Sequence, residues 1–312
     1  MARQKRMYEE RGLYFVTART FQARMLLTPS DALNQVIGGV LARSVMLTGV
    51  QLHGFVVASN HVHLLVTAEG DRLSAFMQHF LGNVARKVGR LRDWRGSLWQ
   101  RRFAAEPVID DEAAIGRLRY IIAHGVKEGL VRHPAEWPGL SCLPLLLAGG
   151  TQSYRVFHWA RRWRHGVLVE GGEQLLDHRW SDLVCLELTP LSCWAQLSPE
   201  ARRARVDALV EQVVEEGAAA HQSVPGAHAV QTQHPHARPT KFKKSPQPRC
   251  HASTWRARRE HRAKASSWDA AYAAASREFR KGDWGVPFPR WAFRPSAASI
   301  ERDVGVVPRR PT

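Results

Sequence analysis

The chain has 312 residues, and its hydrophobic fraction of 44% is sufficient for a buried core, which excludes disorder throughout. Lys and Arg total 45 against 28 Asp and Glu, so the net charge is +17. An excess of this size favours a polyanionic partner, nucleic acid ahead of an anionic membrane surface, because cationic side chains neutralise phosphates and release counterions.

Three features of the sequence predict a protein of the cytoplasm. The longest wholly apolar run, residues 143–148, is far shorter than the ~20 residues that span a bilayer. The N-terminus is charged, and the apolar stretch of a signal peptide does not follow it. The four cysteines form no CxxC pair, which fits a reducing compartment. We therefore expect a soluble, nucleoid-associated protein with no membrane partner.

Strand and helix patterns alternate along the first 148 residues. Runs of β-branched and aromatic residues indicate strands, and apolar residues at helical spacing indicate helices. Only Ser59-Asn60 separates two of the strands, which predicts a tight hairpin. The order matches the β-α-β-β-α-β pattern of an α+β, ferredoxin-like domain at 1–148, followed by a further helix. The predicted elements are a strand at 13–19, a helix at 31–47, strands at 50–58 and 61–68, a helix at 71–91, a strand at 99–109 and a helix from 111.

The remainder of the chain gives weaker patterns. Residues 149–217 form a connecting segment that is rich in Trp and Arg, without a clear element before a helix that starts at Ser198-Pro199-Glu200. Residues 218–240 lack periodicity and are interpreted as a linker. Residues 241–312 are predicted to be a basic, mostly helical or irregular accessory region, with cationic blocks at 241–244 and 256–264.

The pair His61-Val62-His63 is the first chemically informative group. On a strand, residues i and i+2 face the same side, so both imidazoles can bind one cation. The sequence has fifteen histidines, so such pairs also arise by chance. Taken alone, this pair is therefore also open to the interpretation that it binds no metal. A second pair, His234-Pro235-His236, lies in the predicted linker and is interpreted as unrelated to a site.

The helix that begins near residue 111 carries the second group. Four of its polar side chains share one face at i, i+3, i+7 and i+10, whereas apolar side chains on another face can pack on the sheet. A phenol, an imidazole and two cations in one row suit phosphodiester chemistry, as a nucleophile, a third metal ligand and phosphate contacts. These four residues are Arg117, Tyr120, His124 and Lys127.

A divalent metal suits this set of residues. Ionising a free tyrosine at pH 7 costs about 4 kcal/mol. A cation held by His61, His63 and His124 would neutralise charge on the phosphate and align it for attack by Tyr120. The attack leaves a phosphotyrosine link that stores the bond energy for rejoining.

Three ordered motifs resemble the REP-associated tyrosine transposases, which are single-tyrosine HUH transposases: ASNHVHLLV, LWQRRFAAEPVIDDE and LRYIIAHGVKEGLV. The resemblance covers about residues 12–145. It implies a ferredoxin-like fold, a divalent metal (Mg²⁺ or Mn²⁺), and cleavage of single-stranded, hairpin-bearing DNA through a 5′-phosphotyrosine intermediate. It also implies that His61 and His63 are ligands and that Tyr120 is the nucleophile. Members of the family occur as monomers and as homodimers.

The chain departs from the family at His124-Gly125, where the family usually has Asn-Pro and the Asn supplies the third ligand. An imidazole at this position can still coordinate. Because it is a softer donor, it shifts the preference towards manganese, zinc or cobalt. Ser59 also replaces the usual Pro of the histidine motif.

The expected DNA-binding residues combine aromatic and cationic side chains, as is common for single strands. Trp99 and Phe103 are equally consistent with packing in the core. The DNA-binding residues that we predict are Asn60, Trp99, Arg101, Arg102, Arg117 and Lys127.

Two other functions remain open from the sequence. The departure at His124-Gly125 and the basic accessory region also fit a catalytically inactive DNA-binding protein of the same fold. Three imidazoles also suit a zinc-dependent hydrolase, in which the phenol is dispensable. We rank the tyrosine transposase first, on the three ordered motifs, the inactive DNA-binding protein second and the zinc-dependent hydrolase third.

Overall fold

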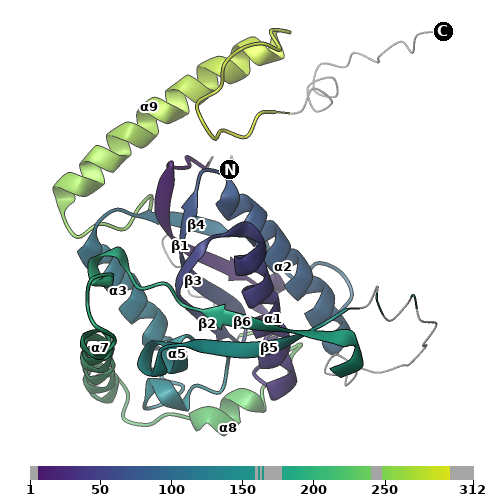
Figure 1. Ribbon diagram of the computed structural model, residues 1–312, viewed down its shortest axis with the longest axis vertical. Coiled ribbons are helices and arrows are strands. Elements are labelled where there is room, and N and C mark those ends of the chain that lie inside the picture. The colour runs from purple at the N-terminus through teal and green to yellow at the C-terminus, as the bar shows by residue number, and fades with distance from the viewer. Residues whose placement is uncertain (1–5, 159–160, 162–163, 165–177, 240–247, 296–312) are drawn as a thin grey trace.

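The computed structural model describes residues 6–158, 161, 164, 178–239 and 248–295 (Figure 1). Its centre is an antiparallel sheet with the strand order β2-β3-β1-β4. This order, with a helix after β1 and another after β3, confirms the predicted ferredoxin-like α+β fold. The elements of this part are β1 (Arg11–Arg19), α1 (Asp31–Thr48), β2 (Gln51–Ala58), β3 (His61–Glu69), α2 (Arg72–Leu91), β4 (Ala104–Val108), α3 (Asp111–Ile122), α4 (His124–Lys127) and α5 (Leu143–Ala148).

Helices cover both faces of this sheet. α1 and α2 pack side by side on one face, and α3 contacts β2 and β3 on the other (Figure 1). Alternate residues of each strand therefore point to different layers. Val62 and Leu64 of β3 are fully buried on the side of α1 and α2, whereas His61 and His63 face α3.

Side-chain caps fix where two of these helices begin. Ser30 Oγ accepts a hydrogen bond from Leu33 N at the start of α1, and Asp110 Oδ1 accepts one from Ala113 N at the start of α3. The last strand is shorter than predicted, because β4 begins at Ala104. Trp99 instead bridges Thr20 and directs its indole N–H to Leu81 O, which separates residues 99–103 from the strand.

The hydrophobic core continues past residue 148, where the sequence predicted a boundary. The hairpin of β5 (Thr151–Phe157) and β6 (Ser181–Glu187) packs on α1. A Cβ at Gly38 of α1 would lie 2.1 Å from the Tyr154 ring, so this glycine permits the close approach. These short strands mix polar and apolar residues, and packing on α1 rather than a sequence pattern determines them.

Residues 218–240, expected as a linker, are largely structured in the part of the chain that the model describes. α7 (Pro199–Ala220) packs against α3, α4 and α5, and α8 (Gly226–Gln231) follows it. Further along, the carbonyl of Ala237 accepts a hydrogen bond from Met25 N, and His236 Nε2 lies 3.1 Å from Arg92 O. Contacts with distant loops thus order a segment that has no periodicity of its own.

The accessory region begins against the sheet and then leaves it. Residue 251 forms a bridge with Val108 of β4, and α9 (Trp255–Arg280) extends from there as a long helix at one end of the molecule (Figure 1). The basic block 256–264 lies on α9, whereas 241–244 lies outside the described residues. The four cysteines are unpaired. Among the described residues, none of the helices combines the length and the apolar character that a membrane span requires.

Candidate functional site

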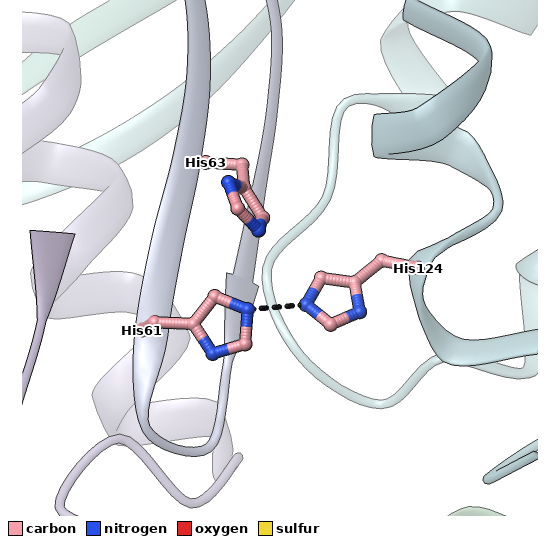
Figure 2. A group of neighbouring side chains, drawn as sticks. All are labelled: His61, His63 and His124. Atoms are coloured by element: carbon pink, nitrogen blue, oxygen red, sulfur yellow. Dashed lines mark hydrogen bonds between the residues drawn. The ribbon is translucent and has the colours of Figure 1, made fainter. Parts of the chain in front are cut away.

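Three imidazoles meet on the face of the sheet that α3 covers. His61 and His63 project from β3 and His124 from the start of α4, and one nitrogen of each lies within 4.8 Å of the others. Figure 2 shows the three rings turned toward one another across the space between the two segments. The structure thus brings together the three histidines that the sequence singled out. The described residues contain no other such group of three potential metal ligands.

Hydrogen bonds to neighbouring side chains orient two of these rings. Asn60 Oδ1 lies 2.6 Å from His61 Nδ1, and Thr17 Oγ1 lies 2.9 Å from His63 Nδ1. Each bond leaves Nε2 of the ring as the nitrogen that can coordinate an ion. Partners of this kind fix the orientation of histidine ligands in metal sites and raise their basicity. The arrangement therefore fits a divalent metal held by nitrogen donors.

The protonation state of the cluster follows from its partners. The Asn60 amide donates through Nδ2 to Ala23 O, so its Oδ1 can only accept, and His61 Nδ1 carries a proton. His61 Nε2 is then an acceptor, and His124 Nε2, at 2.7 Å, must be the donor. An ion that binds both Nε2 atoms requires the proton of His124 to move to its Nδ1.

Burial keeps the cluster uncharged at neutral pH. His63 is 6% exposed and His124 is 5% exposed. Desolvation lowers the pKa of His61 and of His63 well below the usual value, and repulsion from His124 lowers both further. Desolvation also lowers the pKa of His124. Neutral imidazoles have the free lone pairs that coordination requires.

The Tyr120 ring lies directly beside the histidine cluster. Its centroid is 5.3 Å from that of His63, edge to face, and 6.5 Å from that of His124. The helix is not continuous here, because α3 ends at Ile122 and α4 starts at His124. The two segments nevertheless present the phenol and the imidazole to the same site. The Tyr120 hydroxyl makes no hydrogen bond to the residues that the structure describes.

Two cations flank the phenol ring. Lys127 Nζ lies 4.2 Å from the ring centroid, and Arg117 Cζ lies 5.1 Å from it. Burial raises the pKa of Tyr120, the Glu128 carboxylate raises it further, and the charge of Arg117 lowers it. The charge of Arg117 thus opposes the cost that burial places on a phenolate.

The other predicted DNA-binding residues divide into two groups. Arg101 and Arg102 are exposed. Trp99 and Asn60 instead make contacts within the protein: the Trp99 indole donates to Leu81 O, and Asn60 bonds to His61 and Ala23. Asn60 thereby positions a histidine of the cluster.

Sequence reasoning missed two residues that pack beside the phenol. Phe15 of β1 stacks on His63 at 5.0 Å and contacts the Tyr120 ring edge to face at 5.6 Å. His251, from the accessory region, contacts Phe15 edge to face at a centroid distance of 5.6 Å, and its Nε2 lies 2.7 Å from Glu106 Oε2. Alternation along β1 could have placed Phe15 on this face. Nothing in the sequence places His251 there, because 131 residues separate it from Tyr120 along the chain.

Trp137 supports the third histidine. Its ring lies parallel to that of His124, at a centroid distance of 6.3 Å and an interplanar angle of 6°, and its indole N–H donates to Val57 O. Gly125 permits this approach, because a Cβ there would lie 2.8 Å from Trp137 Cε3 and 2.9 Å from Val131 Cγ2. Glycine at this position thus belongs to the packing that holds His124.

We expect Gly125→Ala to weaken metal binding at the cluster at least tenfold. The added methyl group must displace Trp137 or move His124, and overpacking of this kind costs about 1–3 kcal/mol. Titration of the purified variant with Mn²⁺ measures the effect. Gly116→Ala is the matched control, since a Cβ at Gly116 of α3 meets nothing within 4 Å. Equal metal affinities of the Gly125 variant and the wild type would contradict the proposed packing role.

Comparisons with known proteins give one family match and several structural matches. Residues 23–123 match the family model described as "Transposase IS200 like". A structure of a REP-associated tyrosine transposase bound to a REP hairpin is 22% identical, with a TM-score of 0.42, and the match covers 48% of this chain and 87% of that one. A crystal structure from Deinococcus radiodurans R1, described only provisionally as a transposase, is 20% identical, with a TM-score of 0.29, and the match covers 38% and 95%. No curated protein matches the chain.

Proposed function

We propose that the protein cleaves and rejoins single-stranded DNA by transesterification at Tyr120. The match of residues 23–123 to the IS200-like transposase model supports this proposal. The observation that carries this proposal is the contact of the Tyr120 ring with His63 of the three-histidine cluster, at 5.3 Å. A phenol beside a cluster of neutral imidazoles, with two cations over its ring, provides a nucleophile, ligands and phosphate contacts in one place.

The reaction forms one bond and breaks one. Tyr120 Oη attacks a phosphorus atom of the DNA, the Oη–P bond forms, and the P–O3′ bond breaks. The phenol loses a proton, and the leaving O3′ takes one up and ends as a hydroxyl. The other DNA fragment stays attached to Tyr120 through its 5′-phosphate. Attack by another 3′-hydroxyl reverses the step, so joining needs no nucleotide cofactor.

Arg117 and Lys127 lower the energy of this step. The phosphate gains charge on its non-bridging oxygens during attack, and cations near those oxygens stabilise it. Arg117 lies over both the Tyr120 and the Phe15 rings, so its guanidinium is held at the site before DNA binds. The same charge opposes the effect of burial on the phenol.

We further propose that His61, His63 and His124 hold a divalent metal. When bound, it supplies a positive charge that neutralises the phosphate and orients it towards the phenol. Three nitrogen donors favour manganese, cobalt or zinc over magnesium, which prefers oxygen ligands. Asn60 and Thr17 keep the two β3 imidazoles aimed at the ion.

The expected substrate is single-stranded DNA that carries a hairpin, which places the protein at the nucleoid in the cytoplasm. The experiment is incubation of the purified protein with a labelled, hairpin-bearing oligonucleotide and Mn²⁺. We expect a protein–DNA adduct that survives denaturation. Absence of an adduct with each of Mn²⁺, Mg²⁺, Co²⁺ and Zn²⁺ would contradict the proposed reaction.

The three nitrogen donors also favour one competing function, a zinc-dependent hydrolase. Such an enzyme would release both DNA fragments free and would retain activity without the phenol. A catalytically inactive DNA-binding protein would give neither fragments nor an adduct. The same incubation therefore separates the three functions.

A further inference from the structure

α9 presents two chemically different faces along its 26 residues. One face is packed, with His261, Ala275 and Phe279 buried. The opposite face carries four exposed arginines in two pairs. Successive residues are offset by 100° around the axis, so positions 18 apart coincide after five turns and lie about 27 Å apart. The two coinciding pairs are Arg259 with Arg277 and Arg262 with Arg280.

The charge on this face is not neutralised by the described residues. None of the four arginines forms an ion pair with a described carboxylate, and Arg259 lies over the Trp255 ring at 5.4 Å. Two acidic residues of α9 have other partners: Glu260 pairs with Arg256, and Glu278 pairs with Lys281. The third, Asp269, lies between Arg262 and Arg277 along the helix and forms no ion pair with a described residue, so the face keeps a net positive charge. The four arginines form an interrupted row of cations, which can contact the phosphates of a polyanion at two places along its length.

The start of α9 is attached next to the phenol. His251, four residues before the helix, contacts Phe15, which also contacts the Tyr120 ring. Asp110 caps α3, the helix of Tyr120, and its second oxygen accepts a hydrogen bond from Ser253 N at 2.8 Å. Further along, Lys264 pairs with Glu9 at 2.6 Å. α9 is thus held in a set direction relative to the catalytic helix.

We propose that the Arg259, Arg262, Arg277 and Arg280 face of α9 binds the phosphate backbone of double-stranded DNA that flanks the strand cleaved at Tyr120. This proposal rests on the proposed function for the identity of the cleaved strand. A single strand is usually held by stacking on several aromatic rings, and within α9 this face offers only Trp255. A straight row about 27 Å long instead matches about 8 base pairs of a rigid duplex at 3.4 Å per pair.

The test compares two probes and two variants. The probes share one single-stranded target, and one of them also carries a duplex flank of about 16 base pairs, twice the span of the arginine row. The first variant is R259Q/R262Q/R277Q/R280Q. The control is R132Q/R202Q/R203Q/R205Q, which removes the same charge from Arg132 and from three arginines of α7. α7 lies away from α9 (Figure 1). Thermal melting confirms that both variants are folded.

We expect the first variant to bind the flanked probe at least tenfold more weakly than the wild type does, and to bind the unflanked probe equally well. The slope of log affinity against log salt for the flanked probe should fall by about 3 to 4, close to one unit for each lost phosphate contact. The control variant should keep the wild-type slope. The proposal is overturned if the first variant keeps the wild-type affinity and slope for the flanked probe. It is also overturned if the control variant loses as much affinity for that probe as the first variant does.

The Tyr120 adduct is measured separately on the same samples. A salt slope that falls as expected, with no adduct in any protein, supports binding by α9 and contradicts cleavage. An adduct in every protein, with an unchanged slope, supports cleavage and contradicts binding by α9. The two proposals can therefore fail independently.

Discussion

Tyr120→Phe is expected to abolish the covalent DNA adduct and to leave both folding and DNA binding intact. The substitution removes one oxygen, which makes no hydrogen bond to the described residues, and keeps the ring that contacts Phe15, His63 and Lys127. Loss of a nucleophile lowers rates by roughly 10⁴-fold or more. Gel separation of the adduct after a timed incubation, beside an anisotropy titration with the same oligonucleotide, measures both quantities.

Tyr154→Phe is the matched control for this prediction. Tyr154 is buried on β5, and its hydroxyl has no hydrogen-bond partner among the described residues, so the variant should fold and form the adduct at the wild-type rate. If Tyr120→Phe still cleaves DNA and releases free fragments, the phenol is not the nucleophile, and the zinc-dependent hydrolase becomes the better interpretation.

His61→Ala is expected to remove metal binding and, with it, adduct formation. The substitution deletes one of the three proposed ligands and the hydrogen-bonded partner of His124. In the wild type, Mn²⁺ at 100 times its dissociation constant should stabilise the fold by about 2.7 kcal/mol, which corresponds to roughly 5–10 °C in Tm. The variant should show no such shift, and its adduct yield should fall at least about 100-fold.

His228→Ala serves as the control for the metal experiment. His228 is an exposed histidine of α8 outside the cluster, so its loss should change neither the Mn²⁺-dependent shift nor the adduct. Chelation of the metal from the wild type should reproduce the behaviour of His61→Ala. Full adduct yield in a chelated sample would contradict a role for the metal in the reaction.

The sequence predicted the sheet of the fold because its patterns are local. The apolar runs in β2 and β3, the two-residue connection between these strands, and the cap at Ser30 are each features of a few neighbouring residues. Both strands are almost wholly buried, and their apolar runs distinguish them clearly from the segments on either side. The β5–β6 hairpin was not predicted, because its own composition does not indicate strands. The hairpin forms where Tyr154 of β5 packs against Gly38 of α1.

The sequence also placed the principal residues of the candidate site. His61 and His63 share a strand, and Tyr120 and His124 lie four residues apart, so simple periodicity relates the members of each pair. That the two pairs meet depends on how α3 packs across the sheet, which the resemblance to a family supplied. The roles of Asn60 and Trp99 could not be predicted from the sequence, because each side chain donates a hydrogen bond to the carbonyl of a residue that is distant in the sequence.

Contacts from the accessory region could not be predicted at all. His251 reaches Phe15 and Glu106 because residues 248–254 lie along the free edge of β4. No periodicity or motif in the sequence predicts that a single residue will pair with the edge strand of a sheet. The connection between α9 and the phenol is therefore visible only in three dimensions.

The most direct test of the central claim is mass spectrometry of the trapped protein–DNA conjugate after proteolysis. The proposed reaction predicts one modified peptide, in which a nucleotide 5′-phosphate is linked to Tyr120. A nucleotide attached to a different residue, or DNA that is cleaved without any modified peptide, would contradict it.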